Sequence, residues 1–488
     1  MLQLAILIGV IIKFNDYFVF FYALSILVSF LVVVWILNHH LNPDYKIAWI
    51  IIILLFPIFG GLIYIFFANS PLCQRRKKKM AVIQAKALTA LNPQLSVLAE
   101  LERKNQTAAN QSRYLQDFAH SPIYKNTFTE YLPTGEITFE RLKEELLKAE
   151  HYIFLEYFII EEGIMWDSIL EILKEKVKQG LEVRVIYDDV GCLFTLPYGY
   201  NKDLEKMGIK CSVFNPLLPV LSLRFNNRDH RKIAIIDGHT AFTGGINLAD
   251  EYINAYEKYG HWKDSAIMLK GEAVWSFTVL FLSMWDYLRG EDEDFNLFKS
   301  PNLPEGQSED WGYVQPFADN PDNEAVGEIV YLNMINKAQK YVYITTPYLI
   351  VDNQMITALS AAAKSGVDVR LITPYIGDKW FVQVVSRSYY KNLISNGVKI
   401  YEYLPGFIHS KTFVVDDCYG IVGTINMDYR SLYMHFECGV WMYGSKSVLD
   451  IKDDFLKTLE KSKQIGLKDI KWYRSWLGSL LRIFAQFM

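Results

Sequence analysis

Long apolar runs open the chain, and shorter runs in which apolar and polar residues alternate fill the rest. Two of the long runs, at 18–37 and 47–67, contain no charged side chain. Each has about 20 residues, the length that a helix needs to cross roughly 30 Å of hydrocarbon. The pattern therefore predicts two transmembrane helices in a membrane anchor at residues 1–70. The leading run at 1–12 is too short to cross a bilayer, so we expect an interfacial segment or an uncleaved signal-like sequence.

A basic cluster, QRRKKK at residues 74–79, follows the second apolar run directly. Basic residues beside a transmembrane helix favour the cytoplasmic side, most strongly in short loops. We therefore expect a multi-pass protein of the cell membrane whose N-terminus and whose bulk beyond residue 79 face the cytoplasm. The same cluster can bind anionic lipid head groups. We expect residues 71–120, which are basic and then polar, to form a linker.

From about residue 121 onward, β-rich runs follow amphipathic stretches in an order that occurs twice. Three segments of the first copy have counterparts in the second: 149–159 and 338–350, 178–189 and 364–375, and 204–214 and 393–403. Alternation of this kind is typical of an α/β fold with a mixed or mostly parallel sheet. A repeat of domain size predicts two similar α/β lobes, at 121–310 and 311–466, related by a pseudo-two-fold axis.

A polar motif recurs within the repeat. The sequence DHRKIAIIDGHTAFTGGIN of the first copy aligns with IHSKTFVVDDCYGIVGTIN of the second. Packing explains a repeated apolar alternation, but it gives no reason to repeat polar residues at fixed spacing. A single H-x-K-x-x-x-x-D match is a weak signal, whereas two equivalent copies indicate the two halves of one active site. Four pairs are each 179 positions apart: His230 and His409, Lys232 and Lys411, Asp237 and Asp416, and Asn247 and Asn426.

These residue types suit phosphoryl transfer. A neutral imidazole attacks phosphorus and forms a phosphohistidine, while the opposite imidazole, when protonated, donates to the leaving alkoxide. We expect Lys232 and Lys411 to hold the phosphoryl oxygens and the amides of Asn247 and Asn426 to add hydrogen-bond donors. We predict no metal and no cofactor, since the five cysteines are scattered and the sequence offers no cluster with metal-ligand spacing.

The paired blocks resemble the two HKD motifs of the phospholipase D superfamily, and this resemblance runs from about residue 120 to the C-terminus. The N-terminal NPDYKIAWIIIILLFPIFGGLIYIFF resembles the membrane anchor of bacterial cardiolipin synthases. The resemblance implies an acidic residue after each motif that orients a histidine, here Asp264 in GHWKDSAI and Glu437 in YMHFECGV. It also implies that His230 is the nucleophile and His409 the general acid, roles that the nearly symmetric sequence does not assign.

Other polar residues near the motifs are expected to have different roles. Asp237 and Asp416 each follow a four-residue apolar strand. We group them with the catalytic motif residues, but we expect them to close the strand end by hydrogen bonds. His261 and His435 lie close to the two acids without a repeated spacing to the motifs, so we interpret them as packing or rim residues.

The resemblance implies that the intermediate is released by an alcohol. The donor is then phosphatidylglycerol, glycerol leaves, and the terminal hydroxyl of a second phosphatidylglycerol accepts, which gives cardiolipin. Alternatives are a membrane-bound phospholipase D that hydrolyses lipid, a nuclease of the same superfamily and a catalytically inactive lipid-binding scaffold. The formal net charge of −4 lacks the basic excess of a nucleic-acid binder. We therefore expect anionic membrane lipid and no nucleic acid as the partner, and the sequence leaves the oligomeric state open.

The C-terminal segment at 467–488 predicts an amphipathic helix. Its apolar residues from Tyr473 to Phe484 fall on one helical face, and its basic residues lie elsewhere. This pattern suits a helix in the surface of a membrane with anionic lipid, or a helix packed on the second lobe.

Overall fold

A computed structural model describes residues 15–38, 43–62, 64, 71–216, 227–300, 311–321, 324–470, 472–482 and 485. The chain divides into two compact units, an N-terminal unit at 1–79 and a C-terminal unit that contains nearly all residues from Met80 onward. The predicted interfacial or signal-like run at 1–12 lies outside the described residues.

The described part of the N-terminal unit contains one helix long enough to cross a membrane. It is α2 (Asn15–Asn38), of which 22 residues from Tyr17 to Asn38 are sufficiently apolar. The second helix, α3 (Pro43–Leu55), has 13 residues and ends at a turn over 56–59. Proline removes a backbone donor and clashes with the preceding turn of a helix, so Pro57 accounts for this end. The second predicted transmembrane segment is therefore interrupted, whereas the first is one continuous helix.

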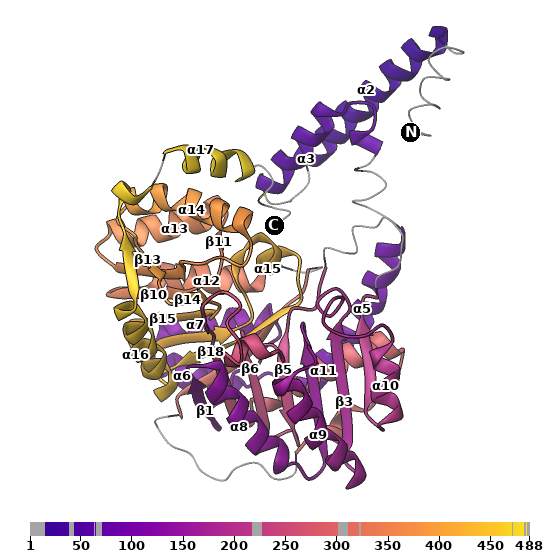
Figure 1. Ribbon diagram of the computed structural model, residues 1–488, viewed down its shortest axis with the longest axis vertical. Coiled ribbons are helices and arrows are strands. Elements are labelled where there is room, and N and C mark those ends of the chain that lie inside the picture. The colour runs from indigo at the N-terminus through magenta and orange to yellow at the C-terminus, as the bar shows by residue number, and fades with distance from the viewer. Residues whose placement is uncertain are drawn as a thin grey trace. The chain divides into compact units, whose positions relative to one another are not determined.

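Seven strands form the first sheet of the C-terminal unit (Figure 1), in the order β1 (Thr127–Leu132), β8 (Ala266–Gly271), β6 (Thr240–Gly244), β5 (Lys232–Ile236), β2 (Tyr152–Tyr157), β3 (Glu182–Asp188) and β4 (Lys210–Phe214). Strands β2, β3 and β4 run parallel and β5 is antiparallel to β2, so the sheet is mixed. The helices of this part of the chain are α8 (Gly135–Leu147), α9 (Ile164–Lys178), α10 (Tyr200–Lys206) and α11 (Val274–Arg289).

Eight strands form the second sheet, in the order β9 (Tyr313–Asp319), β18 (Glu437–Tyr443), β16 (Tyr419–Gly423), β15 (Thr412–Val415), β10 (Tyr341–Thr345), β12 (Asp368–Pro374), β13 (Lys399–Tyr403) and β19 (Ser462–Ile465). This order matches the first sheet strand for strand, and β19 adds one strand at the edge. The helices are α12 (Val326–Lys337), α13 (Asn353–Lys364), α14 (Trp380–Ser395), α15 (Tyr429–Tyr433), α16 (Lys446–Glu460) and α17 (Trp472–Leu481). The predicted α/β class is confirmed.

The two sheets share one hydrophobic core. A single cluster of buried side chains includes Phe154 and Ile235 from the first sheet and Val414 and Val440 from the second. A short parallel ladder of β7 (His261–Lys263) with β14 (Gly406–Ile408) also joins the two halves of the sequence. A second ladder, of β11 (Leu349–Ile350) with β17 (Met427–Asp428), lies within the second half. The two halves therefore fold as one unit rather than as separate domains.

The predicted linker at 71–120 is instead mostly helical. It forms α5 (Pro71–Ala90), α6 (Leu95–Lys104) and α7 (Gln106–Asp117). Leu98, Leu101 and Leu115 are buried in the core of the second sheet. The spacing of Leu98 and Leu101 is typical of one face of a helix. Because many Gln and Asn residues surround this narrow apolar stripe, the overall composition indicated a linker rather than helices.

The C-terminal helix α17 packs on α14 and still exposes apolar side chains. A Cβ atom at Gly478 would lie only 2.7 Å from the Cβ of Ser388 in α14, so the two helix backbones approach closely. Trp476 and Leu480 are exposed on the same helix. The helix therefore packs on the second lobe through α14, and its exposed apolar side chains leave a place in the membrane surface as a prediction.

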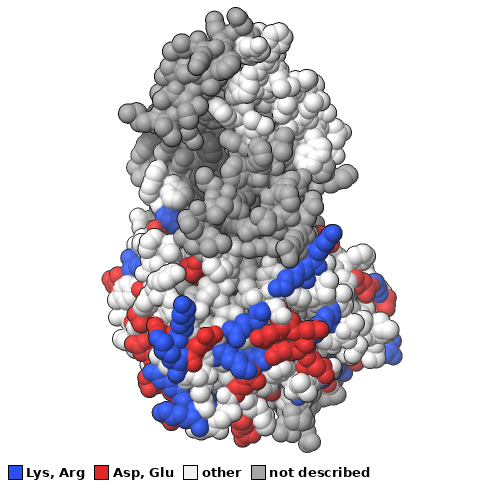
Figure 2. All heavy atoms as spheres, turned by 90° about the vertical axis from the view of Figure 1, so that its right-hand side faces the viewer, with Lys and Arg blue, Asp and Glu red and all other residues white. Residues whose placement is uncertain are grey.

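Charged side chains on the surface of the C-terminal unit are mixed in sign. Figure 2 shows basic and acidic residues interspersed on one face. Ion pairs of this kind include Lys206 with Asp203 at 2.7 Å in α10 and Arg289 with Glu205 at 3.2 Å. This face therefore agrees with a formal net charge close to zero rather than with a broad basic surface.

Asp237 and Asp416 each close the end of one motif strand. The carboxylate of Asp237 accepts hydrogen bonds of 2.8 Å from three consecutive backbone N–H groups, at Glu150, His151 and Tyr152. Asp416 does the same for residues 339–341, at 2.7 to 2.8 Å. Both aspartates have a φ of +52°, a left-handed conformation that Asp tolerates better than most residues. This placement agrees with the structural role expected of both.

We predict that Asp237→Ala and Asp416→Ala each destabilise the C-terminal unit by about 3 kcal/mol, because three backbone donors lose a charged acceptor. The corresponding Asn variants keep one acceptor oxygen and should lose about half as much. Denaturant unfolding of the full chain in detergent measures this, with the exposed Asp453→Ala as a control. Alanine variants as stable as the control would contradict the role.

Candidate active site

Each motif histidine bonds to the acid that follows the other motif. His230 Nδ1 lies 2.9 and 3.0 Å from the two carboxylate oxygens of Glu437. His409 Nδ1 lies 2.6 Å from Asp264 Oδ2. All four residues are buried. The structure therefore brings together the histidines and acids predicted from the sequence. Each histidine is paired with the acid of the other half of the sequence, an arrangement that we call the exchange of acids.

The backbone makes the same exchange. The N–H of His230 donates to the carbonyl of Phe436 at 2.9 Å, and the N–H of His409 donates to the carbonyl of Lys263 at 2.7 Å. Phe436 and Lys263 each directly precede one of the acids. Main-chain hydrogen bonds therefore hold each histidine in register with the acid that it contacts.

Lys232 is the first residue of β5 and Lys411 directly precedes β15, and both side chains point back to the histidines. Lys232 Nζ donates to the carbonyl of His230 at 2.6 Å, and Lys411 Nζ donates to the carbonyl of His409. Burial lowers the pKa of Lys232 to about 8 and that of Lys411 to about 7, although nearby carboxylates oppose the shift. An anion bound beside these ammonium groups would restore their full charge, since an opposite charge favours the charged form.

The two histidines have different electrostatic surroundings. Burial and the charge of Lys411 lower the pKa of His409 to about 4, even though Asp264 opposes the shift. Burial and the charge of Lys232 lower the pKa of His230 well below its ordinary value. Burial alone would raise the pKa of Asp264, but Lys411 and His409 outweigh it and lower the pKa overall. Burial instead raises the pKa of Glu437, the partner of His230. His409, paired with the acid that stays ionised, is thus the histidine better placed to hold a proton.

Aromatic rings pack around both histidines. The Phe158 ring meets His230 edge-on at a centroid distance of 5.0 Å. Phe407 stacks on His409 at 5.6 Å, with Trp262 at 5.5 Å. These rings hold the imidazoles in place and keep the local dielectric low, which strengthens every charge interaction in the site. Sequence analysis did not identify them, because an aromatic side chain in an apolar run carries no distinctive signal.

His435, which we interpreted as a packing or rim residue, packs beside His230 in the buried centre. Its buried ring lies 5.7 Å from the ring of His230, and its Nδ1 lies 3.8 Å from Glu437 Oε1. Neither of its ring nitrogens has a hydrogen-bond partner among the described residues. Its position two residues before Glu437 was the available signal. His261, by contrast, bonds to the hydroxyl of Tyr403 at 3.0 Å and packs beside it.

One group of side chains could in principle hold a metal ion. His230, His435 and Glu437 offer ligand atoms that all lie within 4.8 Å of one another. His230 and Glu437 already share a hydrogen bond, so a metal there would have to displace that bond. We therefore interpret the three residues as part of the histidine centre, and a metal-free site stays our prediction.

The two predicted phosphate ligands differ in their contacts. Asn247 accepts from the backbone N–H of Ile159 at 3.0 Å and donates to the hydroxyl of Tyr252 at 2.6 Å, so it positions Tyr252, whose ring lies 5.7 Å from that of His409. The Asn426 side chain is buried, and its Oδ1 has no partner among the described residues. Phosphate binding by both stays a prediction.

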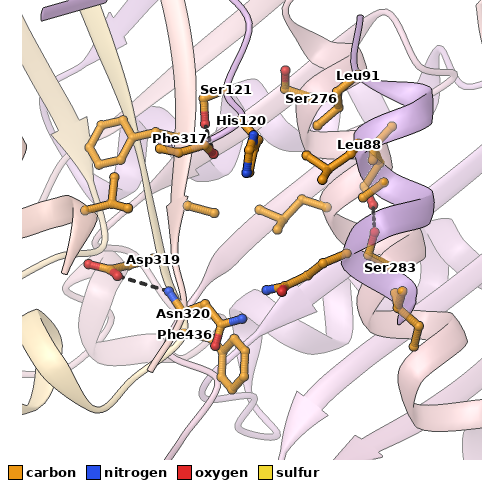
Figure 3. A pocket seen from close by; sticks show the side chains of 18 of the residues that line it. Leu88, Leu91, His120, Ser121, Ser276, Ser283, Phe317, Asp319, Asn320 and Phe436 are labelled. Carbon is orange, nitrogen blue, oxygen red and sulfur yellow. Dashed lines mark hydrogen bonds between the residues drawn. The ribbon is translucent and has the colours of Figure 1, made fainter. Parts of the chain in front are cut away.

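A cavity of about 570 Å³ lies beside the centre rather than within it. Leu88 and Leu91 of α5, Ser283 of α11 and Phe317 of β9 line it (Figure 3). Its lining also includes Phe436, the residue before Glu437, but none of the ten predicted site residues. The predicted chemistry therefore takes place outside this cavity.

Comparisons with known proteins give a consistent family. A model described as "Cardiolipin synthase, PLD-like domain" matches residues 142–285 and 331–459, and one described as "Phospholipase_D-nuclease N-terminal" matches 26–69. The first model spans both motifs, and the second covers most of α2 together with α3. The two matches thus include every predicted site residue.

Relatives align over most of the chain. A cardiolipin synthase of Halalkalibacterium halodurans is 35% identical over 93% of this chain and 90% of its own length. Cardiolipin synthase 2 of Bacillus anthracis is 36% identical over 89% and 84%, and an uncharacterized protein of Streptococcus mutans is 46% identical over 89% and 94%. Among solved structures, phosphatidylserine synthase of Haemophilus influenzae matches with a TM-score of 0.57, covering 78% of this chain and 98% of its own. At 16% identity this match shows the fold alone.

We predict that the free energy of unfolding falls at low pH, because the folded state binds a proton at His409 less readily than the unfolded state does. The pKa of His409 is lowered from 6.5 to about 4, so the unfolded chain binds a proton in this range that the folded chain refuses. Stability is then complete above pH 6.5 and falls as the pH drops towards 4, with His409 contributing up to about 1.4 kcal/mol per pH unit. Unfolding of the full chain in detergent between pH 7 and pH 4 measures the slope. We expect His409→Asn to have a shallower slope than the exposed-residue control His151→Asn, and equal slopes would contradict this origin.

Proposed function

We propose that this chain, which belongs to the cardiolipin synthase family of phospholipase D-like proteins, transfers a phosphatidyl group from one phosphatidylglycerol to another and releases glycerol. It is a phosphatidyltransferase. The observation that carries the proposal is the buried centre in which two histidines, each bonded to the acid of the other half, lie beside two lysines. No residue of the two motifs is substituted, so an inactive scaffold is disfavoured.

In the first half-reaction, His230 is the nucleophile. Glu437 accepts the Nδ1–H of His230, which leaves the Nε2 lone pair free to attack phosphorus. An Nε2–P bond forms while the bond from phosphorus to the glycerol oxygen breaks. Protonated His409 donates to that oxygen, so glycerol leaves as an alcohol. Lys232 and Lys411 would stabilise the charge that builds up on the phosphoryl oxygens.

In the second half-reaction, His409 acts in the opposite sense. It takes the proton from the terminal hydroxyl of the second phosphatidylglycerol, and that oxygen attacks phosphorus. The bond from phosphorus to Nε2 of His230 breaks, which releases cardiolipin and restores both histidines. The greater readiness of His409 to hold a proton supports this assignment of roles.

We also propose an arrangement of the chain around this centre. The matching strand order of the two sheets supports a pseudo-two-fold axis between the histidines. The apolar helices α2 and α3, followed by exposed Lys78 and Lys79, support a multi-pass anchor with the C-terminal unit in the cytoplasm. Exposed Trp476 and Leu480 of α17 would lie in the surface of the same membrane.

Vesicles with phosphatidylglycerol labelled in its head group test the reaction. The full chain should release glycerol and form cardiolipin in equal amounts, and phosphatidic acid as the sole lipid product would overturn the synthase assignment in favour of a hydrolase. His230→Ala and His409→Ala should each lower the rate at least about 1,000-fold, because each removes an obligatory proton or bond partner. His261→Ala, outside the centre, serves as the control and should stay within about twofold.

The exchange of acids predicts which histidine each acid supports. Formation of the bond to His230 and release of glycerol are one displacement, so Asp264→Asn, through His409, and Glu437→Gln, through His230, should each slow it about 100-fold or more. Quenching in alkaline detergent during turnover of phosphate-labelled lipid traps label on the protein, because a phosphohistidine is stable in base. We expect slower labelling in both acid variants and none above background in His230→Ala. With a lipid whose leaving group is an acidic phenol, which needs no proton, Asp264→Asn should recover most of its rate and Glu437→Gln should not. The opposite pattern would show that the roles of the histidines are reversed.

A further inference from the structure

Two loops carry aromatic side chains that the fold leaves in solvent. The first, at 189–199, follows β3 and exposes Phe194 by 94% and Tyr198 by 107%. The second, at 375–379, lies between β12 and α14; Tyr375 in it is exposed by 47%, and Trp380, the first residue of α14 at the end of the loop, by 68%. Isolated exposed apolar residues are ordinary, but these four occupy corresponding loops of the two sheets.

Both loops leave the sheets at the edge that carries the histidines. In the first sheet Tyr157, the last residue of β2, pairs with Lys232, and β3 runs parallel to β2. In the second sheet Thr345, the last residue of β10, pairs with Thr412 next to Lys411, and β12 runs parallel to β10. The carboxyl ends of β3 and β12 therefore lie at the motif edge of their sheets.

The base of the first loop is attached to residues beside His230. Thr195 Oγ1 donates to the carbonyl of Ile160 at 2.7 Å. A Cβ atom at Gly191 would lie 2.0 Å from the carbonyl oxygen of Phe158, so the loop backbone passes directly over that residue. Phe158 is the ring that packs against His230. The exposed tip of this loop is thus fixed at its base rather than loosely attached.

The base of the second loop is attached to residues beside His409. Tyr348 donates its hydroxyl to Asp378 Oδ2 at 2.7 Å, and its ring lies 6.4 Å from that of Phe407. Phe407 stacks on His409. Gln383 Nε2 also donates to the carbonyl of Tyr375 at 2.6 Å. Each loop therefore connects an exposed aromatic tip to the ring that packs on one motif histidine.

We propose that these two loops, the rim loops, insert their aromatic tips into the surface of the bilayer on either side of the histidine centre and so bring the centre to the lipid head groups. The occupant is the lipid interface because Phe, Tyr and Trp prefer the boundary between head groups and acyl chains, and exposed Lys379 in the second loop suits an anionic surface. The inference rests on the proposed function, since only a lipid substrate requires the centre to meet a bilayer. The rim loops add to the anchor, which holds the chain on the membrane without orienting the centre.

Two substrate forms test the proposal with the full chain. One is phosphatidylglycerol diluted in phosphatidylcholine vesicles, and the other is phosphatidylglycerol with six-carbon chains, dispersed below the concentration at which it aggregates. In the double variant Phe194→Ser/Tyr198→Ser and in Trp380→Ser, the mole fraction of phosphatidylglycerol that gives the half-maximal rate on vesicles should rise roughly tenfold. The free energy lost with one buried aromatic side chain corresponds to a factor of this order. The rate with the dispersed lipid should stay within about twofold of the unmodified chain. Phe118→Ser, an equally exposed aromatic residue on another surface, should change neither.

Equal losses with both substrates would overturn the proposal, because they would place the loops in the shape of the centre rather than at the membrane. Unchanged vesicle kinetics would overturn it as well. A separate measurement does not depend on the reaction. Lipids brominated near the head group should quench the fluorescence of the unmodified chain more than that of Trp380→Phe, and identical quenching would count against insertion. If the unmodified chain forms no cardiolipin from either substrate, the proposed function fails. The quenching measurement still tests whether the rim loops insert into the bilayer.

Discussion

The rest of the structure depends on one pair of contacts, in which each motif histidine bonds to the acid of the other half. Glu437 and Asp264 are fully buried, and each has as its imidazole partner the histidine of the other half. A buried carboxylate without a partner costs several kcal/mol. Neither half can therefore bury its acid and complete its site alone, which explains why the two sheets share one core and fold as a single unit.

The strands on both sides of this contact are fixed at their far ends by Asp237 and Asp416. Each aspartate lies five residues beyond its motif lysine, so about 15 Å of strand separates it from the histidine edge. Three backbone hydrogen bonds at that end set the position of each strand against its neighbour. The position of the imidazole is thus determined from both ends, by Asp237 or Asp416 at one and by the exchanged acid at the other.

The repeat and the α/β class could be predicted from the sequence, and a fixed separation of 179 positions revealed the eight motif residues as equivalent pairs. Asp264 and Glu437, which are 173 positions apart, were predicted only from the resemblance to the phospholipase D superfamily. Equivalence is not contact, so the spacing could not show that Glu437 belongs to His230. His435 has no counterpart in the repeat, so its position beside His230 could not be predicted from the spacing. The helices at 71–117 were hidden by polar composition, and the interruption of the second apolar segment depends on how one residue, Pro57, acts in an otherwise uniform run.

The balance of buried charge explains how one site serves two proton states. Without substrate, burial holds both histidines neutral and raises the pKa of Glu437, whereas Lys411 and His409 keep the pKa of Asp264 low. A phosphodiester brings one further negative charge into this low-dielectric site, which favours the protonated form of whichever base gains a proton most easily. That base is His409, since Asp264 opposes the shift that burial imposes on it. In the proposed reaction, substrate binding would therefore supply the proton that His409 needs as general acid, and His230 would stay neutral and able to attack.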